Sequence, residues 1–364
     1  MTGYIYLLWG WIRNEILAIP GRIIAVVFFL SLLSFPLFIQ ETYYLRIIIL
    51  ATIFSLFAAS WDLLSGFTGQ LNLGHALFFG VAAYGAALIN IHFDMPPWIT
   101  IPLGGIGAVL VGLIAGIPAL RLRGFYLGLV TLSFPLILTG LIFVFPDFTG
   151  GELGLSGVDR LSSSRIVSYY TIVIVFAISV LFLWKFSDAK SKLFRVGVLL
   201  HAIREDEIAA RAAGINTTHY KLLAFAVSGF FAGIAGGLYA HFLRIAGPST
   251  LDLFFSFQAI LWTIFGGIAT IYGAVAGVFI LYPLVEFLSL YTLGEELRYV
   301  FFCVILIIFL LFMPEGITVW VLDKIEIKCP RCKVINVFTR QTCRACRARL
   351  RLDKRTEETG GKKL

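Results

Sequence analysis

The segment AIREDEIAARAAGINTTHYKLLAFAVSGFFAGIAGGLYAH, residues 202–241, contains the two kinds of structure that decide the fold of this chain. Its first half is rich in Ala, Glu and Arg, which are strong helix formers. Its second half enters a charge-free run, Leu222–Leu243, which is long enough to cross a bilayer as a helix of about 20 residues. A polar helix outside the membrane therefore leads directly into a membrane-spanning helix.

The composition extends this reading to the whole chain. Of 364 residues, 59% are hydrophobic and 14% are charged, whereas soluble domains carry about 25% charged residues. Such a chain cannot cover itself with polar surface, so lipid is its expected solvent. The net charge of +8 does not predict nucleic-acid binding, because 13 of the 29 Lys and Arg residues lie in the last 42 residues.

Charge-free runs predict an all-α polytopic membrane protein with about ten transmembrane helices. The first run follows Arg13 and Arg22 and lacks a small-residue cleavage site after it, so we expect a retained helix. The longest run divides at Gly266-Gly267 and Gly273 into a helix up to about residue 268 and another from about 271. The runs are Ile23–Gln40, Ile47–Trp61, Leu63–Ile91, Met95–Leu120, Gly124–Pro146, Ile166–Trp184, Leu222–Leu243, Leu253–Val285 and Tyr299–Pro314.

The distribution of Lys and Arg predicts the orientation. With the N-terminus in the cytoplasm, the inner segments before the tail hold eleven of these residues and the outer segments hold five. Cytoplasmic loops carry the excess of positive charge. Loop 185–221 and both termini are therefore expected in the cytoplasm.

Glycines recur at four-residue spacing in three of the predicted helices. Gly104, Gly112 and Gly116 share one face, as do Gly229, Gly233 and Gly237, and Gly273 with Gly277. Small residues at this spacing let helices approach closely in lipid. Close packing is the preferred interpretation, and direct substrate contact is the alternative.

Motifs for enzymatic chemistry are not found: the sequence has no Walker A loop, nucleophile elbow or HExxH helix. Three ionisable residues, Asp62, His241 and Glu286, lie near predicted helix ends, where we expect them to reach water. Transport is therefore a better use of many helices than catalysis, and we expect no enzymatic activity in this chain.

One polar stretch interrupts the apolar runs. Residues 68–80, TGQLNLGHALFFG, place Gln70, Asn72 and His75 between glycines. Broken helices expose such groups to a transport pathway, so these three are candidate translocation residues. A helix cap with an interhelical hydrogen bond explains the same pattern equally well.

The cytoplasmic loop contains a predicted short helix from Arg204 to Ala213 that ends at Gly214. Ile203, Ile208 and Ala212 would form its weak apolar face. The helix would either lie on the membrane surface or dock a cytoplasmic partner.

The tail contains a metal-binding pattern, C-x2-C-x10-C-x2-C, formed by Cys329, Cys332, Cys343 and Cys346. Four thiolates at this spacing suit a tetrahedral structural zinc ion, and thiols stay reduced in the cytosol. The expected domains are a transmembrane domain over 1–322, a cytoplasmic zinc ribbon over 323–352 and a disordered tail over 353–364. Acidic partners or anionic lipid suit the basic ribbon better than nucleic acid.

Several stretches together resemble the permeases of branched-chain amino-acid ABC transporters, specifically the LivM-type subunit. They are GQLNLGHALFFGVAAYGAAL (69–88), LRLRGFYLGLVTLSF (120–134), TGGELGLSG (149–157), the segment 202–241 and FGGIATIYGAVAG (265–277). The resemblance covers about residues 45–315 and leaves the cysteine tail outside.

The resemblance implies a coupling loop that enters a groove on an ATPase. Its EAA…G signature matches Glu207, Ala209, Ala210 and Gly214 loosely, with the acid one position early, and Arg204 lies in the same loop. It also implies a second permease subunit, two ATP-binding subunits and an extracytoplasmic amino-acid-binding protein. This chain would sit in the inner (cytoplasmic) membrane, bind no nucleotide itself and translocate Leu, Ile or Val.

Four other functions remain as alternatives. Related systems carry urea or short amides, so those are alternative substrates. The helices would otherwise anchor the ribbon, or the chain would be a membrane enzyme or an ion-driven transporter.

Overall fold

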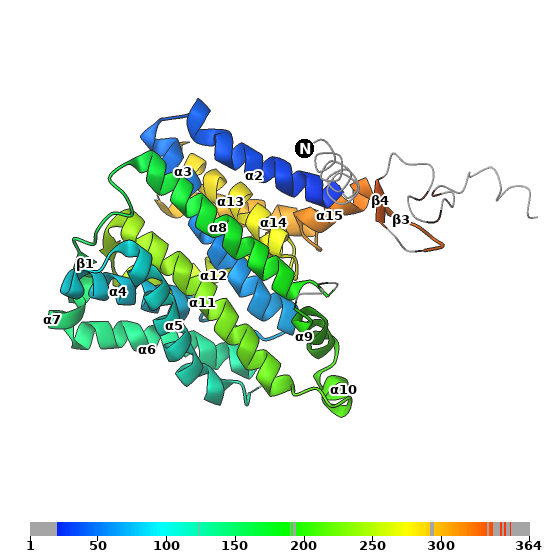
Figure 1. Cartoon of the computed structure of the whole chain (residues 1–364), viewed down its shortest axis with the longest axis horizontal. Coiled ribbons are helices and arrows are strands. Elements are labelled where there is room, and N and C mark those ends of the chain that lie inside the picture. Colours follow the sequence, from blue (N-terminus) through cyan, green and yellow to red (C-terminus); the bar gives the residue numbers. More distant parts are fainter. Residues whose placement is uncertain are drawn as a thin grey trace, which may run out of the picture. The chain divides into compact units, whose positions relative to one another are not determined.

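The computed structural model describes residues 20–122, 124–189, 191, 194–291, 295–332, 335–337, 343, 346 and 350 (Figure 1). The chain forms two compact units. One consists of Phe35–Ile317, and the other combines Met1–Ser34 with Thr318–Leu364.

The larger unit is helical apart from one short antiparallel pairing, in which Leu155 of β1 (Leu155–Ser156) faces Ala246 of β2 (Ile245–Ala246). Its long helices are α3 (Thr42–Trp61), α4 (Ala76–Phe93), α5 (Pro97–Ala119), α6 (Phe125–Val144), α8 (Arg165–Ser187), α11 (Thr217–Leu243), α12 (Leu253–Gly266), α13 (Ile271–Tyr291) and α14 (Glu295–Phe312). Its short elements are η2 (Asp62–Gly66), α7 (Pro146–Thr149), η3 (Gly151–Leu153), α9 (Val196–Glu205), α10 (Glu207–Ala212) and η4 (Pro248–Leu251).

The expected membrane architecture is confirmed. Eight helical stretches of the described residues are long and apolar enough to cross a membrane, and two shorter apolar helices, Ile23–Phe38 and Leu253–Gly266, bring the apolar helices to about ten. The long run at 253–285 divides where expected, because Gly267 has a φ of +123° between α12 and α13.

The run Leu63–Ile91 is not one helix. The helix α3 continues through a π-helical turn, η2, and the chain then leaves helical geometry at 69–75 before α4 begins at Ala76. Gly69 has a φ of +69°, which a residue with a side chain rarely adopts. Hydrophobicity alone could not locate this break, because its flanks are as apolar as the helices.

The centre of the larger unit is the packing of α4, α5 and α11 against one another. A Cβ on Gly233 of α11 would lie 2.8 Å from the Cα of Gly105 on α5, and one on Gly104 would lie 2.7 Å from the carbonyl oxygen of Ala82 on α4. Glycines 112 and 229 both contact the ring of Phe78. The glycine faces therefore serve close helix packing, as their spacing predicts.

Two ionisable groups that were expected to reach water are fully buried. The carboxylate of Asp62 accepts a hydrogen bond from the N–H of Ala269 at 2.7 Å, because η2 extends the helix beyond it. The ring of His241 is within hydrogen-bond distance of Thr100 Oγ1 (2.7 Å) and the carbonyl oxygen of Asp159 (2.8 Å). The segment before α8 covers this end of α11. The prediction that Asp62 and His241 reach water is therefore wrong. Glu286 is half-buried on α13.

The smaller unit contains the first part of α2 (Pro20–Phe38), most of α15 (Ile317–Ile325) and an antiparallel hairpin of β3 (Glu326–Lys328) and β4 (Ile335–Val337). Lys328 pairs with Ile335. The strand β4 lies between the two cysteine pairs in sequence and pairs with β3, which precedes the first pair, so Cys329 and Cys332 lie in the connection. The tail 353–364, predicted to be disordered, lies outside the described residues.

Candidate functional site

The break between η2 and α4 gathers the three polar residues that the sequence singled out. Gln70 and Asn72 are 3% exposed and His75 is fully buried. Asn72 Nδ2 lies 3.3 Å from His75 Nδ1, and His75 Nε2 lies 2.9 Å from Ser60 Oγ. Asn72 Oδ1 also accepts the N–H of Gly74 at 3.0 Å. Asn72 and His75 therefore fix the shape of the non-helical segment.

Neighbouring helices supply the remaining backbone partners of this segment. The indole N–H of Trp61 donates to the carbonyl oxygen of Asn72 at 2.7 Å. Thr131 on α6 and Ser256 on α12 accept the N–H groups of Leu73 and Ala76. Buried backbone groups outside a helix need such partners. Side chains of three helices supply them here and so stabilise the non-helical segment.

Gln70 differs from its two neighbours. Neither its amide oxygen nor its amide nitrogen has a hydrogen-bond partner among the described residues, and the same holds for Asp62 Oδ2. Buried polar atoms without partners are unfavourable. Gly69, beside Gln70, approaches the Arg204 side chain: a Cβ there would be 3.6 Å from Arg204 Cγ. The break therefore lies next to the end of α9.

The predicted helix Arg204–Ala213 is wrong as a single helix. It divides at Asp206, whose φ of −153° and ψ of 105° end α9 and begin α10. The Asp206 carboxylate accepts the N–H groups of Ile208 and Ala209 at 2.8 and 3.0 Å. An N-terminal cap of this kind stabilises a new helix start, and it outweighs the helix propensity of the flanking residues.

The apolar face predicted for this helix also divides. Ile203 is buried at the end of α9, whereas Ile208 is 70% exposed and Ala212 is exposed. In α10 only Ala210 is buried, and Ala209 is exposed. The helix α10 therefore presents an apolar side chain outward, at the end of the bundle where α8 ends and α11 begins (Figure 1).

Gly214 ends α10 as predicted. Its φ is +85°, its N–H bonds to the carbonyl of Arg211 and the N–H of Ile215 bonds to that of Ala210. This pair of bonds is the Schellman arrangement, which favours glycine. Asn216 then caps α11 by accepting the N–H of His219 at 3.1 Å.

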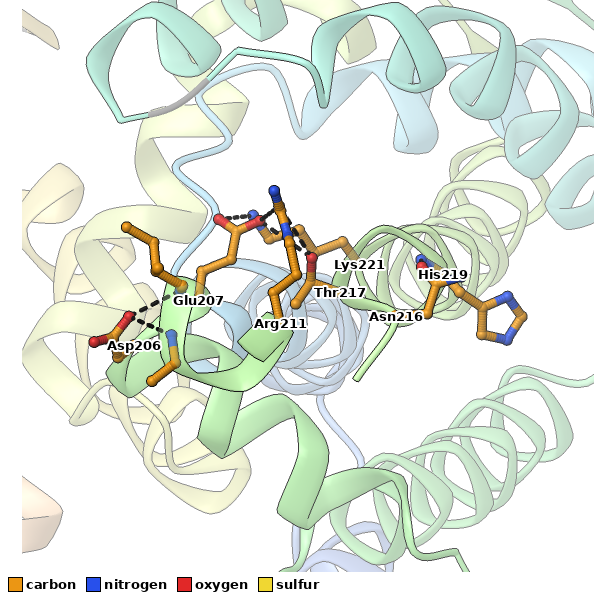
Figure 2. A network of polar contacts seen from close by, with 9 residues as sticks. Asp206, Glu207, Arg211, Asn216, Thr217, His219 and Lys221 are labelled. Carbon is orange, nitrogen blue, oxygen red and sulfur yellow. Dashed lines mark hydrogen bonds and ion pairs between the residues drawn. The ribbon is translucent and has the colours of Figure 1, made fainter. Parts of the chain in front are cut away.

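A polar network joins α10 to the first turns of α11 (Figure 2). One oxygen of Glu207 accepts from Lys221 Nζ at 2.7 Å, and the other accepts from Arg211 at 2.9 Å and from the Thr217 hydroxyl at 3.3 Å. The Lys221 side chain is 14% exposed and that of Glu207 is 20% exposed, against 55% for Arg211. Glu207 and Lys221 therefore form the shielded connection between the two helices.

The four tail cysteines converge on one point. Their sulfur atoms all lie within 4.8 Å of one another, with 3.5 Å from Cys329 to Cys346 and 3.4 Å from Cys332 to Cys343. These distances exceed a disulfide bond of about 2.05 Å and surround the separation of about 3.8 Å that tetrahedral zinc requires. The cluster can bind a metal ion.

Hydrogen bonds prepare this cluster for thiolates. The backbone N–H groups of Cys332 and Arg331 lower the pKa of Cys329. They thereby favour its thiolate, which is the form that binds a metal. The Asn336 amide on β4 donates to Cys343 Sγ at 3.6 Å. Leu350 packs beside the sulfurs as the apolar residue of this cluster.

Sequence reasoning found Glu207 and Gly214 but missed their partners. The sequence could have indicated Asp206 as the start of a new helix, because Asp is a preferred N-terminal cap residue. Lys221 has none, since it lies fourteen residues from Glu207 and only the turn at Gly214 brings them together.

A sequence profile described as "Branched-chain amino acid transport system / permease component" matches residues 43–310. The chain belongs to this family. The branched-chain amino acid permease family therefore accounts for most of the larger unit, and the cysteine tail lies outside the match. The chain is accordingly a multi-pass membrane protein of a transport family.

Individual members of this permease family are also similar to the chain in sequence. The chain is 31% identical over 235 residues to the high-affinity branched-chain amino acid transport system permease protein LivM of Salmonella typhimurium, covering 56% of this chain and 54% of that protein. It is 29% identical to LivM of Escherichia coli, covering 64% and 60%. LivH of Salmonella typhimurium is 26% identical over 309 residues, covering 78% and 96%. The match thus spans little more than half the length of the two LivM proteins.

Proposed function

We propose that this chain is one of two membrane subunits of an ATP-driven importer that carries leucine, isoleucine and valine across the cytoplasmic membrane. The observation that carries the proposal is the family match over residues 43–310. The partners would be a second permease, two ATP-binding subunits and an extracytoplasmic binding protein. Both termini would face the cytoplasm, as the Lys and Arg distribution favours.

Within this importer, α10 would dock on an ATPase. Its exposed Ile208 and Ala209 supply an apolar contact, and its two firmly capped ends make it a rigid element. A push on α10 would pass through the Glu207–Lys221 contact into α11. Arg204 would connect the same motion to the break at Gly69.

The translocation pathway would pass beside the break between η2 and α4. Gln70 has an amide with no partner among the described residues, so it is the group that would hydrogen-bond to a passing amino acid. Asn72 and His75 would keep the segment in shape through their contacts with Ser60 and Gly74.

Reconstitution tests the substrate and the energy source. The chain, its permease partner and the ATPases would be placed in proteoliposomes with the binding protein outside. We expect uptake of labelled leucine that requires ATP in the ATPase compartment. Urea or acetamide carried in place of leucine would assign the alternative substrates, and uptake driven by an ion gradient without ATP would refute an ABC importer.

Variants in the polar network test the coupling. Glu207→Gln and Lys221→Met should raise the ATP hydrolysed per leucine transported, because α10 is no longer held on α11. Glu205→Gln, on exposed α9 surface, is the matched control. Gly214→Leu should have the same effect as Glu207→Gln, since a φ of +85° strains any side chain. An unchanged ratio in all three variants would show that α10 transmits no motion.

We also propose that the tail binds one structural zinc ion through Cys329, Cys332, Cys343 and Cys346. The convergence of the sulfur atoms and the lowered pKa of Cys329 support metal binding by thiolates, and four cysteine ligands suit structural zinc. Zinc would fix the fold of the ribbon and would take no part in transport. Metal analysis of the purified full-length chain should give about one zinc per chain.

A further inference from the structure

A cavity of about 500 Å³ opens among the ends of α3, α8 and α11, away from α9 and α10. Its cationic side chains are Arg46, Arg160, Arg165 and Arg244. Hydroxyl groups of Thr42, Ser162, Ser163 and Ser168 also line it, and the buried His241 lies beside it. The remaining lining is apolar and consists of Ile49, Leu161, Phe242 and Leu243.

This gathering of arginines is unusual for its position. Under the orientation proposed above, the outer segments before the tail hold only five Lys and Arg residues, and four of them line this one cavity. Outer loops of membrane proteins are depleted in such residues. Four arginines from three segments far apart in sequence nevertheless meet at this cavity.

These arginines have no ion-pair partner among the described residues. Arg165 donates to the Thr42 hydroxyl, and Arg244 Nε donates to the carbonyl oxygen of Val158 at 3.1 Å. Across the described residues, none of the four arginines forms an ion pair with a carboxylate, and no acidic side chain lines the cavity. The cavity is therefore prepared for an anionic group from outside.

We propose that this cavity receives acidic side chains of the extracytoplasmic binding protein. A guanidinium group binds a carboxylate through paired hydrogen bonds, and four guanidinium groups suit more than one carboxylate. A free amino acid fits less well, because the lining offers four cations and no acid to pair with its ammonium group. Acidic side chains carried on a protein have no such ammonium group.

The proposal rests on the proposed function, and it adds a site for the delivery step. Unpaired cations at a cavity attract an oppositely charged partner over distance and increase the association rate, an effect that salt weakens. The arginines would thus dock the binding protein at the outer end of α11, while α10 engages the ATPase at the other end.

The test uses the assembled transporter in nanodiscs and measures binding of the loaded binding protein at two salt concentrations. Arg160→Glu combined with Arg165→Glu should weaken binding about tenfold or more at low salt, and a charge-reversed acidic residue on the binding protein should restore it. The milder pair Arg160→Gln and Arg165→Gln should weaken binding less. Arg121→Glu, in the exposed turn after α5, is the matched control. Co-purification of all subunits shows that each variant is assembled.

Each other outcome overturns the proposal. Variants that bind the binding protein as the wild type does, with wild-type uptake intact, would leave the cavity without this role. Loss of free leucine binding in the absence of the binding protein would assign the cavity to the substrate. An effect that disappears in nanodiscs without anionic lipid would assign it to a lipid headgroup. Failure of binding-protein-dependent uptake in the wild type would instead refute the proposed function.

Discussion

In the larger unit, Gly233 of α11 lies against Gly105 of α5, and similar close contacts at glycines pack α4, α5 and α11 together. In the tail, the described core consists of cysteines and Leu350. The helices need only lipid around them and small residues between them. The tail offers too little apolar surface to fold by burial, so the zinc ion proposed for its four cysteines would supply the free energy. The two regions would then depend on different sources of stability.

Metal removal should separate the two regions most strongly. Structural zinc contributes about 10–16 kcal/mol to the folding of small zinc domains, so a chelator should unfold the ribbon and leave the helical unit intact. Amide hydrogen exchange of the full-length chain would rise in 326–350 and stay constant in α4, α5 and α11. Cys343→Ser should act like the chelator, and Cys303→Ser, on exposed α14 surface, should not. Zinc retained by the Cys343 variant would contradict this.

Packing of α5 can be tested by two of its glycines, which have different neighbours. A Cβ on Gly104 would approach the carbonyl oxygen of Ala82, whereas one on Gly107 would meet nothing within 4 Å. Gly104→Ala should lower the free energy of unfolding by about 1–3 kcal/mol, and Gly107→Ala should raise it by up to about 1 kcal/mol. Denaturation in detergent measures both changes. Equal shifts would mean that α5 is not closely packed.

The turn between α12 and α13 offers a smaller test of the same unit. Ala269 has a φ of +60°, held by the hydrogen bond from its N–H to Asp62. Ala269→Gly should raise the free energy of unfolding by up to about 1 kcal/mol, because glycine adopts this geometry without strain. Ala274→Gly, inside α13, should lower it by about 1 kcal/mol. A destabilised Ala269 variant would show that this backbone is not strained.

Removal of residues 324–364 should have the smallest effect on the helical unit. The family match ends at residue 310, so we expect leucine uptake to be partly retained and the thermal unfolding of the helices to change little. Uptake in proteoliposomes and circular dichroism melts measure the two quantities. Complete loss of uptake in a fully assembled transporter would make the tail part of the transport mechanism.

The sequence by itself determined the properties that local composition controls. Runs of apolar residues gave about ten helices because each span must be apolar along its own length. The polar stretch at 68–80, the glycine faces and the end of α10 at Gly214 follow from residues close in sequence. The spacing of the four cysteines likewise predicts a metal site, because each C-x2-C pair can form one zinc knuckle.

Tertiary structure alone decided which distant groups meet. It divided the loop helix at Asp206, buried Asp62 and His241, and left the amide of Gln70 without a partner in the described chain. It also brought Lys221 to Glu207 and arginines from three segments to one cavity. Periodicity reports which face of a helix is apolar, but it carries no information about the neighbour that the face meets. Hydrogen bonds and charge pairs depend on that neighbour, so they emerge only when the helices pack.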